Sequence, residues 1–250
     1  MSTDLSTISE NALSNLPEAL QQKILAASKK IQESSSTTIN KIRLDAKSYT
    51  FPDQNEVQSF QGIILATKHA NVHYRGEYEE GVQNPVDCMA VGDEACKDLS
   101  PHEKVESPHS SRCSTCDFFQ WGSGPRGKGK SCGEHTLLAV YVPSFGDDIL
   151  LLEEKKKNST IVDGYLKTIA KKHGHPIAVV TQFTIGETNK WEQSFAAVEA
   201  VKIELVTNLS SRIEEAEDML TARVVDAYQK SDMPVGSSEA EAPARQARSR

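Results

Sequence analysis

The sequence predicts a β-rich α+β fold for most of its 250 residues. Apolar and polar side chains alternate with a period of two in several short runs, which is typical of half-buried strands. Apolar side chains recur at helical spacing in only a few segments. A polar stretch rich in Gly, Pro and Ser, from Asn71 to Cys132, interrupts the strands. We therefore expect a core built from strands on both sides of one long insertion.

The chain divides into four predicted parts. Residues 1–37 are predicted to be a tail with one helix that begins near Pro17. Residues 38–208 are the predicted core, with the insertion at about 71–135. Residues 209–230 predict an acidic helix, because apolar residues recur there at helical spacing among Glu and Asp. Residues 231–250 are rich in Pro, Ser, Ala, Glu and Arg, a composition that predicts disorder.

The elements of the predicted core follow in a definite order. Strands are expected over residues 39–46 and 59–67 before the insertion, and over 136–142 and 149–153 after it. A helix over 159–172 follows, with Ser159 or Thr160 as its cap and Gly174 and Pro176 ending it. The chain then closes with a hairpin of strands at 177–185 and 191–201. We interpret this order as an OB-like Greek-key barrel, with one strand divided at a turn over 143–148, although other α+β domains share it.

Composition and charge exclude several classes of protein for this chain. The formal net charge is −7 and the pI is about 5.6, which argues against indiscriminate binding to nucleic acid through bulk positive charge. No apolar run approaches the ~18 residues that span a bilayer, and the first 30 residues lack the apolar core of a secretory signal. We expect no membrane association and a cytoplasmic location. Residues 61–111 carry a net −5, whereas residues 112–135 carry +2, so the cysteine-rich segment is locally basic.

The cysteines predict a zinc site. Cys113 and Cys116 form a Cys-x2-Cys turn, and Cys132 follows. This spacing suits tetrahedral zinc, which would order a polar insertion that lacks its own large apolar core. The fourth ligand stays open at this point. The candidates are Cys88, Cys96, His102, His109 and His135. A redox dithiol or buried structural thiols are the alternatives.

A glycine-rich loop between the cysteines predicts nucleic-acid binding. It carries three aromatic residues and then three cations at alternate positions, namely Phe118, Phe119, Trp121, Arg126, Lys128 and Lys130. Exposed rings stack on bases and cations meet phosphates. Packing of the rings and solvation of the lysines is the competing interpretation. A nucleotide-hydrolysing phosphate loop is disfavoured, because no strand precedes the loop and no helix follows it.

The segment from Cys113 to Cys132 resembles a signature in a family of phage and mobile-element proteins. The signature is Cys-x2-Cys-x4-Trp-Gly-Ser-x3-Gly-Lys-Gly-Lys-x-Cys, and the run Val179–Thr184 also matches the family pattern. The resemblance covers about residues 57–200. It implies a zinc-bearing OB-like fold that binds single-stranded DNA in replication or recombination, in the cytoplasm of a host cell. It also implies that Cys88, in a Pro-x-x-Cys segment, is the fourth zinc ligand.

The same resemblance adds Trp191 to the residues expected to stack on bases. The chain departs from the family after Cys132, where Gly133-Glu134-His135-Thr136 replaces a basic run. No set of nucleophile, base and orienting residue is visible, so we expect no enzymatic activity. The alternative function is a zinc-containing interaction factor that docks on a polymerase or another replication or transcription protein. The acidic C-terminal helix is the expected contact surface for such partners.

Overall fold

The computed structural model describes residues 39–45, 47–76, 84–155, 157–186 and 192–232. Apart from Ile39, these belong to one compact unit. The predicted helix of residues 1–37 and the predicted disordered tail from residue 233 onward lie outside the described residues. No helix in the described part is long and apolar enough to cross a membrane.

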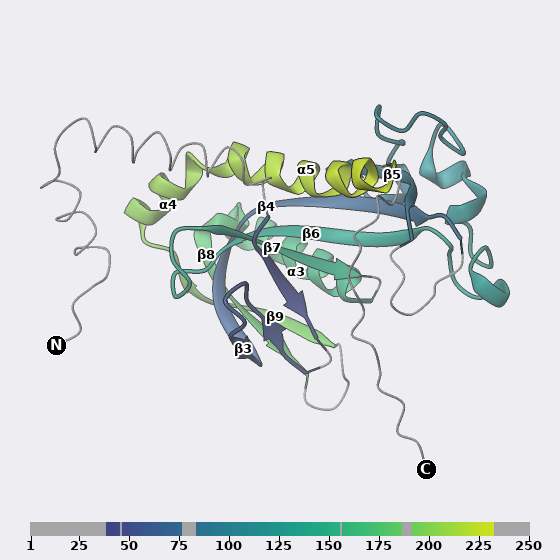
Figure 1. The fold of residues 1–250 in the computed structure, drawn as a ribbon. Helices are drawn as coiled ribbons and strands as arrows, with labels where there is room; N and C mark the ends of the chain where they lie inside the picture. The colour runs from purple at the N-terminus through teal and green to yellow at the C-terminus, as the bar shows by residue number, and fades with distance from the viewer. Residues whose placement is uncertain (1–38, 46, 77–83, 156, 187–191, 233–250) are drawn as a thin grey trace, which may run out of the picture. The chain divides into compact units, whose positions relative to one another are not determined.

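The fold is β-rich and of the α+β class, as predicted. In the described part, nine strands form a mixed sheet that curls into a half-barrel, together with three α-helices (Figure 1). The strand order is β3-β2-β1-β7-β6-β4-β8-β9, and β5 pairs with β4 off this path. The strands are β1 (Lys41–Leu44), β2 (Tyr49–Thr50), β3 (Glu56–Val57), β4 (Ser59–Tyr74), β5 (Val86–Gly92), β6 (Gly133–Tyr141), β7 (Ile149–Lys155), β8 (Val179–Ile185) and β9 (Gln193–Ala200). The helices are α3 (Lys157–His173), α4 (Ile203–Ser210) and α5 (Ile213–Asp232).

The 16-residue strand β4 organises the sheet. Its first part pairs with β8, its middle with β6 and its last part with both β6 and β5, all antiparallel. Gly62 lies where β4 passes from β8 to β6, and a Cβ there would lie 2.6 Å from Val140 Cγ1. Glycine therefore permits the close approach of β6 at this point.

In the first half of the core, one predicted strand is longer than expected and one strand was not predicted. The strand expected over 59–67 continues to Tyr74, and β5 lies inside the segment that was expected to be irregular. The added part of β4 alternates polar and charged side chains with small apolar ones, so its apolar pattern is weak. β5 is short and mostly apolar, and it lies in a segment whose overall composition is polar. The ladder between β4 and β5 holds them in place instead.

The prediction of one strand divided at residues 143–148 is wrong. β6 and β7 are separate antiparallel strands with Tyr141 opposite Ile149, so the turn reverses the chain. Gly146, at φ +121°, supplies a backbone conformation that other residues rarely adopt.

The helices differ from prediction mainly at their ends. α3 begins at Lys157, so Ser159 lies in its first turn, and the Ser159 hydroxyl donates to the Glu154 carbonyl at 2.9 Å. Gly174 ends the helix as predicted, with φ +81° and its N–H on the carbonyl of Ala170 at 3.1 Å. The predicted helix over 209–230 corresponds to α5, which begins four residues later than expected, at Ile213. A separate helix, α4, begins at Ile203, where no helix was predicted, and ends at Ser210.

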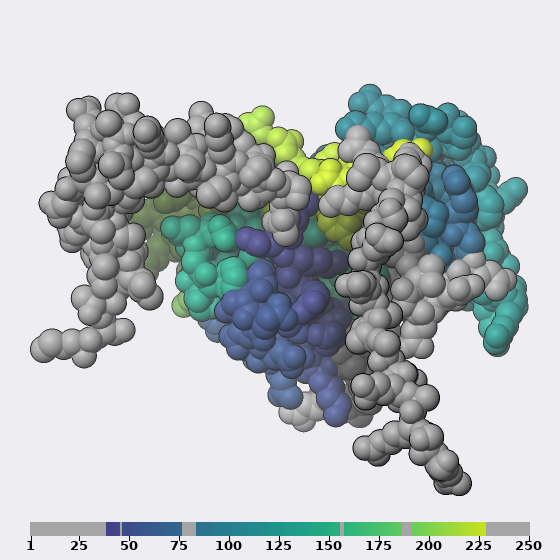
Figure 2. All heavy atoms as spheres, in the orientation of Figure 1, coloured from purple at the N-terminus to yellow at the C-terminus, as the bar shows by residue number. Residues whose placement is uncertain are grey.

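Helix α5 packs on the sheet over β4, β5 and β6 (Figure 1). Its apolar stripe is buried, with Ala216, Leu220 and Val224 at most 4% exposed. Its Glu and Asp side chains at positions 214, 215, 217 and 218 are exposed. The insertion forms a teal lobe beside the yellow end of α5 in Figure 2.

One polar network crosses the interior of the half-barrel. The Tyr49 hydroxyl donates to Gln193 Oε1 at 2.5 Å, and Gln193 Nε2 donates to the carboxyl of Glu154. Burial of Glu154, which is fully enclosed, raises the pKa of its carboxyl to about 7. The network joins β2, β9 and β7, so side chains link strands that are not neighbours in the sheet.

Candidate metal centre and adjoining loop

Four cysteines meet at one small cavity, and they are the four that were predicted as ligands. The cavity is also lined by His73, His109, Phe118 and Phe119, among other residues. The cysteines are Cys88, Cys113, Cys116 and Cys132. The cavity volume is about 20 Å³, which a single water-sized species fills. All five cysteines of the chain are free thiols.

Short local elements place these cysteines. Cys88 lies on β5 opposite His73 of β4. Cys113 begins a 3₁₀ turn, and the N–H of Cys116 donates to the Cys113 carbonyl at 3.1 Å. The N–H of Cys132 donates to the carbonyl of Phe118 at 2.9 Å, which brings the third cysteine of the signature back to the first two. Because three separate segments converge, the sequence spacing alone could not place Cys88.

A small apolar cluster supports the same region. Ala90, Leu99, Cys113 and Phe119 are buried together, and the N–H of Cys113 donates to the carbonyl of Leu99 at 2.9 Å. The insertion therefore has a minimal core of its own, in which a cysteine takes part in the packing.

Burial and hydrogen bonds act on the thiols in opposite directions. Burial raises the pKa of Cys88 to about 11 and also raises the pKa of Cys113 and Cys132. The backbone N–H of His109 at Cys88 and the side chain of Asn71 at Cys113 oppose this effect by hydrogen bonding. Without a metal, Cys88, Cys113 and Cys132 are therefore protonated at neutral pH, so a metal ion has to displace protons when it binds there.

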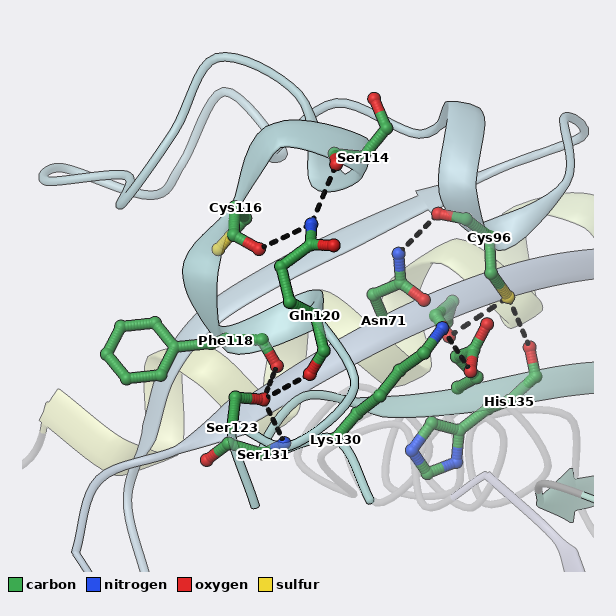
Figure 3. Close-up of polar contacts among 12 residues, drawn as sticks. Asn71, Cys96, Ser114, Cys116, Phe118, Gln120, Ser123, Lys130, Ser131 and His135 are labelled. Carbon is green, nitrogen blue, oxygen red and sulfur yellow. Dashed lines mark hydrogen bonds and ion pairs between the residues drawn. The ribbon is translucent and has the colours of Figure 1, made fainter. Parts of the chain in front are cut away.

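The structure reduces the candidates for the fourth ligand. Cys96 Sγ lies 3.9 Å from the Ala70 carbonyl oxygen and 3.8 Å from the His135 carbonyl oxygen (Figure 3). Cys96 lines a different cavity from the one that the other four cysteines share. The His102 ring accepts from the N–H of Lys104 at 3.2 Å, and His135 Nδ1 lies 2.8 Å from Glu153. Only Cys88 and His109, of the five candidates, line the cavity with the other three cysteines.

Sequence reasoning missed a second group of potential ligands. Within the described residues, one set of three His, Cys, Asp or Glu side chains has its ligand atoms all within 4.8 Å, and it consists of His73, Asp87 and His109. The four cysteine sulfur atoms share the cavity but are spread more widely than this. Of these three residues, the sequence indicated only His109, as a candidate for the fourth ligand of the cysteine site. His73 gave no signal because it lies in a segment where no strand was expected, and nothing in the sequence pointed to Asp87 as a ligand.

The glycine-rich loop is a compact, hydrogen-bonded turn. Ser123 Oγ donates to the Phe118 carbonyl at 2.8 Å and accepts from the N–H of Ser131 at 2.9 Å (Figure 3). The N–H of Gly122 donates to the Gly129 carbonyl at 2.7 Å. A Cβ on Gly124 would lie 2.2 Å from the Lys128 carbonyl oxygen, so no other residue fits there without movement of the backbone.

The predicted nucleic-acid-binding residues have different surroundings. Trp121 is 82% exposed at the surface of the loop, and Arg126 and Lys128 are exposed. Phe119 is only 6% exposed, so its ring packs the insertion and offers no stacking surface to a base. Lys130 is 2.8 Å from Glu134 and lies over the Phe119 ring at 3.6 Å.

Phe118 and Trp191 complete the predicted set. The Phe118 ring stacks on His73, with 4.1 Å between ring centroids, and also contacts His109. Phe118 thus covers the cavity side of the insertion. Trp191 lies outside the described residues.

An open cleft of about 590 Å³ adjoins Trp121. Trp121, Gly129 and Lys130 line one part of it, and Ser159 and Thr160 from the first turn of α3 line another. In the same cleft His69 Nε2 lies 3.2 Å from Asp163, and this hydrogen bond raises the pKa of His69. The cleft is large enough for a nucleotide-sized ligand.

No protein-family model matches the chain, and no curated protein or solved structure matches it either. The resemblance of residues 113–132 to phage single-stranded-DNA-binding proteins therefore stays a prediction.

Proposed function

We propose that this protein binds single-stranded DNA non-enzymatically, through the glycine-rich loop and the cleft beside it. The observation that carries the proposal is Trp121, a large aromatic side chain that is 82% exposed on a turn held by internal hydrogen bonds. An exposed ring on a rigid support is a platform on which a base can stack at low entropic cost.

The charges of the loop support a nucleic-acid ligand. Between Phe118 and Gly133 the sequence has three cations and no acidic side chain. Arg126 and Lys128 are exposed, and no described residue forms an ion pair with either of them. These two cations are available to phosphates, whereas Lys130 is already engaged by Glu134 and Phe119.

The order of the strands supports an OB-like barrel. If β4 is counted as the first strand, then β6, β7, β8 and β9 follow as strands two to five, with α3 between the third and fourth. The first strand then pairs with both the second and the fourth. In OB-folds the loop between strands one and two and the loop between strands four and five contact oligonucleotides. Here the first of these contains Trp121, and in the sequence Trp191 lies between β8 and β9.

We further propose that a zinc ion held by Cys88, Cys113, Cys116 and Cys132 orders the insertion. The four residues line one cavity, and Cys113 is also packed in the small apolar core of the insertion. A tetrahedral site with Zn–S bonds of about 2.3 Å requires the sulfur atoms to draw closer together than they are. A site with four protein ligands is structural, so its part is to hold the loop and Trp121 in place.

The resemblance of residues 113–132 adds the setting. It implies that the DNA is bound during replication or recombination, in the cytoplasm of a host cell, and this part of the proposal depends on the resemblance alone.

The test is a titration of the full chain into a fluorescently labelled oligo-dT at low salt, followed by anisotropy. Replacement of a stacking ring by Ala costs about 1–3 kcal/mol, so Trp121→Ala should weaken binding about 5- to 150-fold. Ile203→Ala is the matched control, because Ile203 is also a large exposed apolar side chain, at 71%, but lies on α4. Equal affinity of Trp121→Ala and wild type would exclude Trp121 as a platform, and no saturable binding by wild type would refute the function.

The second candidate is a docking factor for another replication protein. The observation that favours it is the row of exposed acidic side chains on α5, whose apolar face is already used in packing. A basic partner surface would complement this row. Loss of binding to a purified partner when Glu214, Glu217 and Asp218 are changed to Gln or Asn, with DNA binding unchanged, would support this candidate.

A further inference from the structure

Three side chains from separate segments bring ligand atoms together next to the cysteine-lined cavity. His73 comes from β4, Asp87 from β5 and His109 from the irregular part of the insertion. Asp87 Oδ2 lies 2.6 Å from His109 Nε2 and 3.4 Å from His73 Nδ1, and the three atoms are all within 4.8 Å of one another.

We propose that His73, Asp87 and His109 form a second metal site that binds a divalent transition-metal ion such as zinc or cobalt(II). Two imidazoles and one carboxylate are a donor set that such ions favour. Three protein ligands leave at least one coordination position for water or another small ligand. The inference does not depend on single-stranded-DNA binding.

A bulge in the sheet creates the arrangement. His73 is opposite Cys88 and Tyr74 is opposite Val86, so Asp87 is an extra residue in the ladder between β4 and β5. In a regular strand, Asp87 and Cys88 would point to opposite faces. The bulge re-aims one of them, so that Asp87 reaches His109 while Cys88 lines the cavity with Cys113.

Neighbouring groups fix each of the three side chains. Arg75 donates from Nη2 and Nε to Asp87 Oδ1, at 2.8 and 3.1 Å, which leaves Oδ2 toward the two imidazoles. The Phe118 ring packs against both imidazoles, with ring centroids 4.1 Å from His73 and 4.6 Å from His109. Partners that orient the ligands in this way are typical of metal centres.

Access and burial also suit an ion. The side chain of His73 is 10% exposed and that of Asp87 is 17% exposed, so an ion would be largely shielded. The side chain of His109 is 31% exposed, which gives an entering ion a path from solvent. The competing interpretation is a hydrogen-bonded ion cluster that only joins β4, β5 and the insertion.

Cobalt(II) titration of the metal-stripped, reduced full chain separates these interpretations, because thiolate ligands give a sulfur-to-cobalt charge-transfer band and His/Asp ligands do not. Wild type should take up two equivalents, one with the band and one without it. Asp87→Asn and His109→Gln should each keep the band and weaken the other equivalent at least about tenfold. His102→Gln is the control, since His102 lies outside the cavity and should behave as wild type. Circular dichroism checks that each variant is folded.

Several outcomes would overturn the second site. The first is binding of a single equivalent of cobalt(II), which carries the band. The second is a further equivalent of cobalt(II) whose binding neither Asp87→Asn nor His109→Gln weakens. The third is loss of the band in His109→Gln, which would make His109 a ligand of the cysteine site. Cys113→Ser/Cys116→Ser should remove the band and leave the His/Asp equivalent. If wild type shows no band but an equivalent that Asp87→Asn removes, the cysteine-bound zinc fails and the second site stands.

Discussion

Replacement of Glu154 by Gln should make the stability of the protein less dependent on pH. Glu154 is fully buried on β7 and accepts a hydrogen bond from Gln193, and burial raises its pKa from 4.5 to about 7. The unfolded chain ionises this carboxyl at a lower pH than the folded chain does. The stability associated with the neutral carboxyl is therefore fully present below pH 4.5 and is lost as pH rises to about 7.

The magnitude follows from the two pKa values. At about 1.4 kcal/mol for each pH unit, wild type should lose about 2.5 kcal/mol between pH 5 and pH 8 from this group alone. The Glu154→Gln variant has no carboxyl to titrate at this position, and its amide keeps the shape and a hydrogen bond to Gln193. Urea unfolding of both proteins at pH 5, 6, 7 and 8, followed by circular dichroism, gives the difference in free energy at each pH. From pH 5 to pH 8, the free energy of unfolding of Glu154→Gln should increase by about 2.5 kcal/mol relative to that of wild type.

The adjacent residue provides a control of opposite sign. Burial opposes ionisation of Glu153, but His135 and Lys41 hold the pKa of that carboxyl far below its ordinary value. Glu153→Gln should therefore destabilise the protein at neutral pH, and the deficit should shrink as pH falls below about 4.5. A stability difference between Glu154→Gln and wild type that is constant from pH 5 to pH 8 would refute the reasoning about Glu154.

Three further predictions concern the insertion. Lys128→Ala should make oligo-dT binding less dependent on salt, lowering the slope of log binding constant against log salt concentration by about 0.7. Lys130→Ala should change this slope less, because Lys130 is already paired with Glu134. Equal slopes for the two variants would contradict the prediction. Gly124→Ala should lower the free energy of unfolding in urea by about 1–3 kcal/mol and weaken DNA binding, because the new methyl group meets the Lys128 carbonyl. Unchanged affinity for DNA would show that binding does not depend on the geometry of this loop. Removal of zinc with a chelator should lower the midpoint of thermal unfolding. If free zinc was a thousandfold above its dissociation constant beforehand, the loss of stability is about 4 kcal/mol. An unchanged midpoint would argue against a structural metal.

The sequence predicted the regular parts of the fold because their apolar pattern is strong. Leu150, Leu151 and Leu152 of β7 and the alternation in β8 are examples, and both strands have a buried face. The turn at Gly146 was located correctly but interpreted as a break within one strand. Local turn residues show where the chain bends, whereas only the pairing of Tyr141 with Ile149 shows that it reverses.

The candidate metal site was predictable only where its residues are close together in the sequence. Cys113, Cys116 and Cys132 are close in sequence, so their spacing carries the signal, and the resemblance supplied Cys88. His73 and Asp87 gave no signal, because their meeting depends on the register of β4 and β5 and on the bulge at Asp87. The sequence also could not show which aromatic residues are buried and which are exposed. Burial of Phe119 and exposure of Trp121 depend on how the loop folds back on Leu99 and Gly129.

Strand β4 has a consequence for folding cooperativity. Because one continuous backbone pairs with β8 at one end and β5 at the other, the half-barrel and the insertion share a strand and cannot unfold as independent domains. Free energy supplied by any ion bound at the insertion would then be transmitted to the barrel through β4. Hydrogen exchange of amides in β8 and β6 should therefore slow when metal is added, even though these strands supply no ligand.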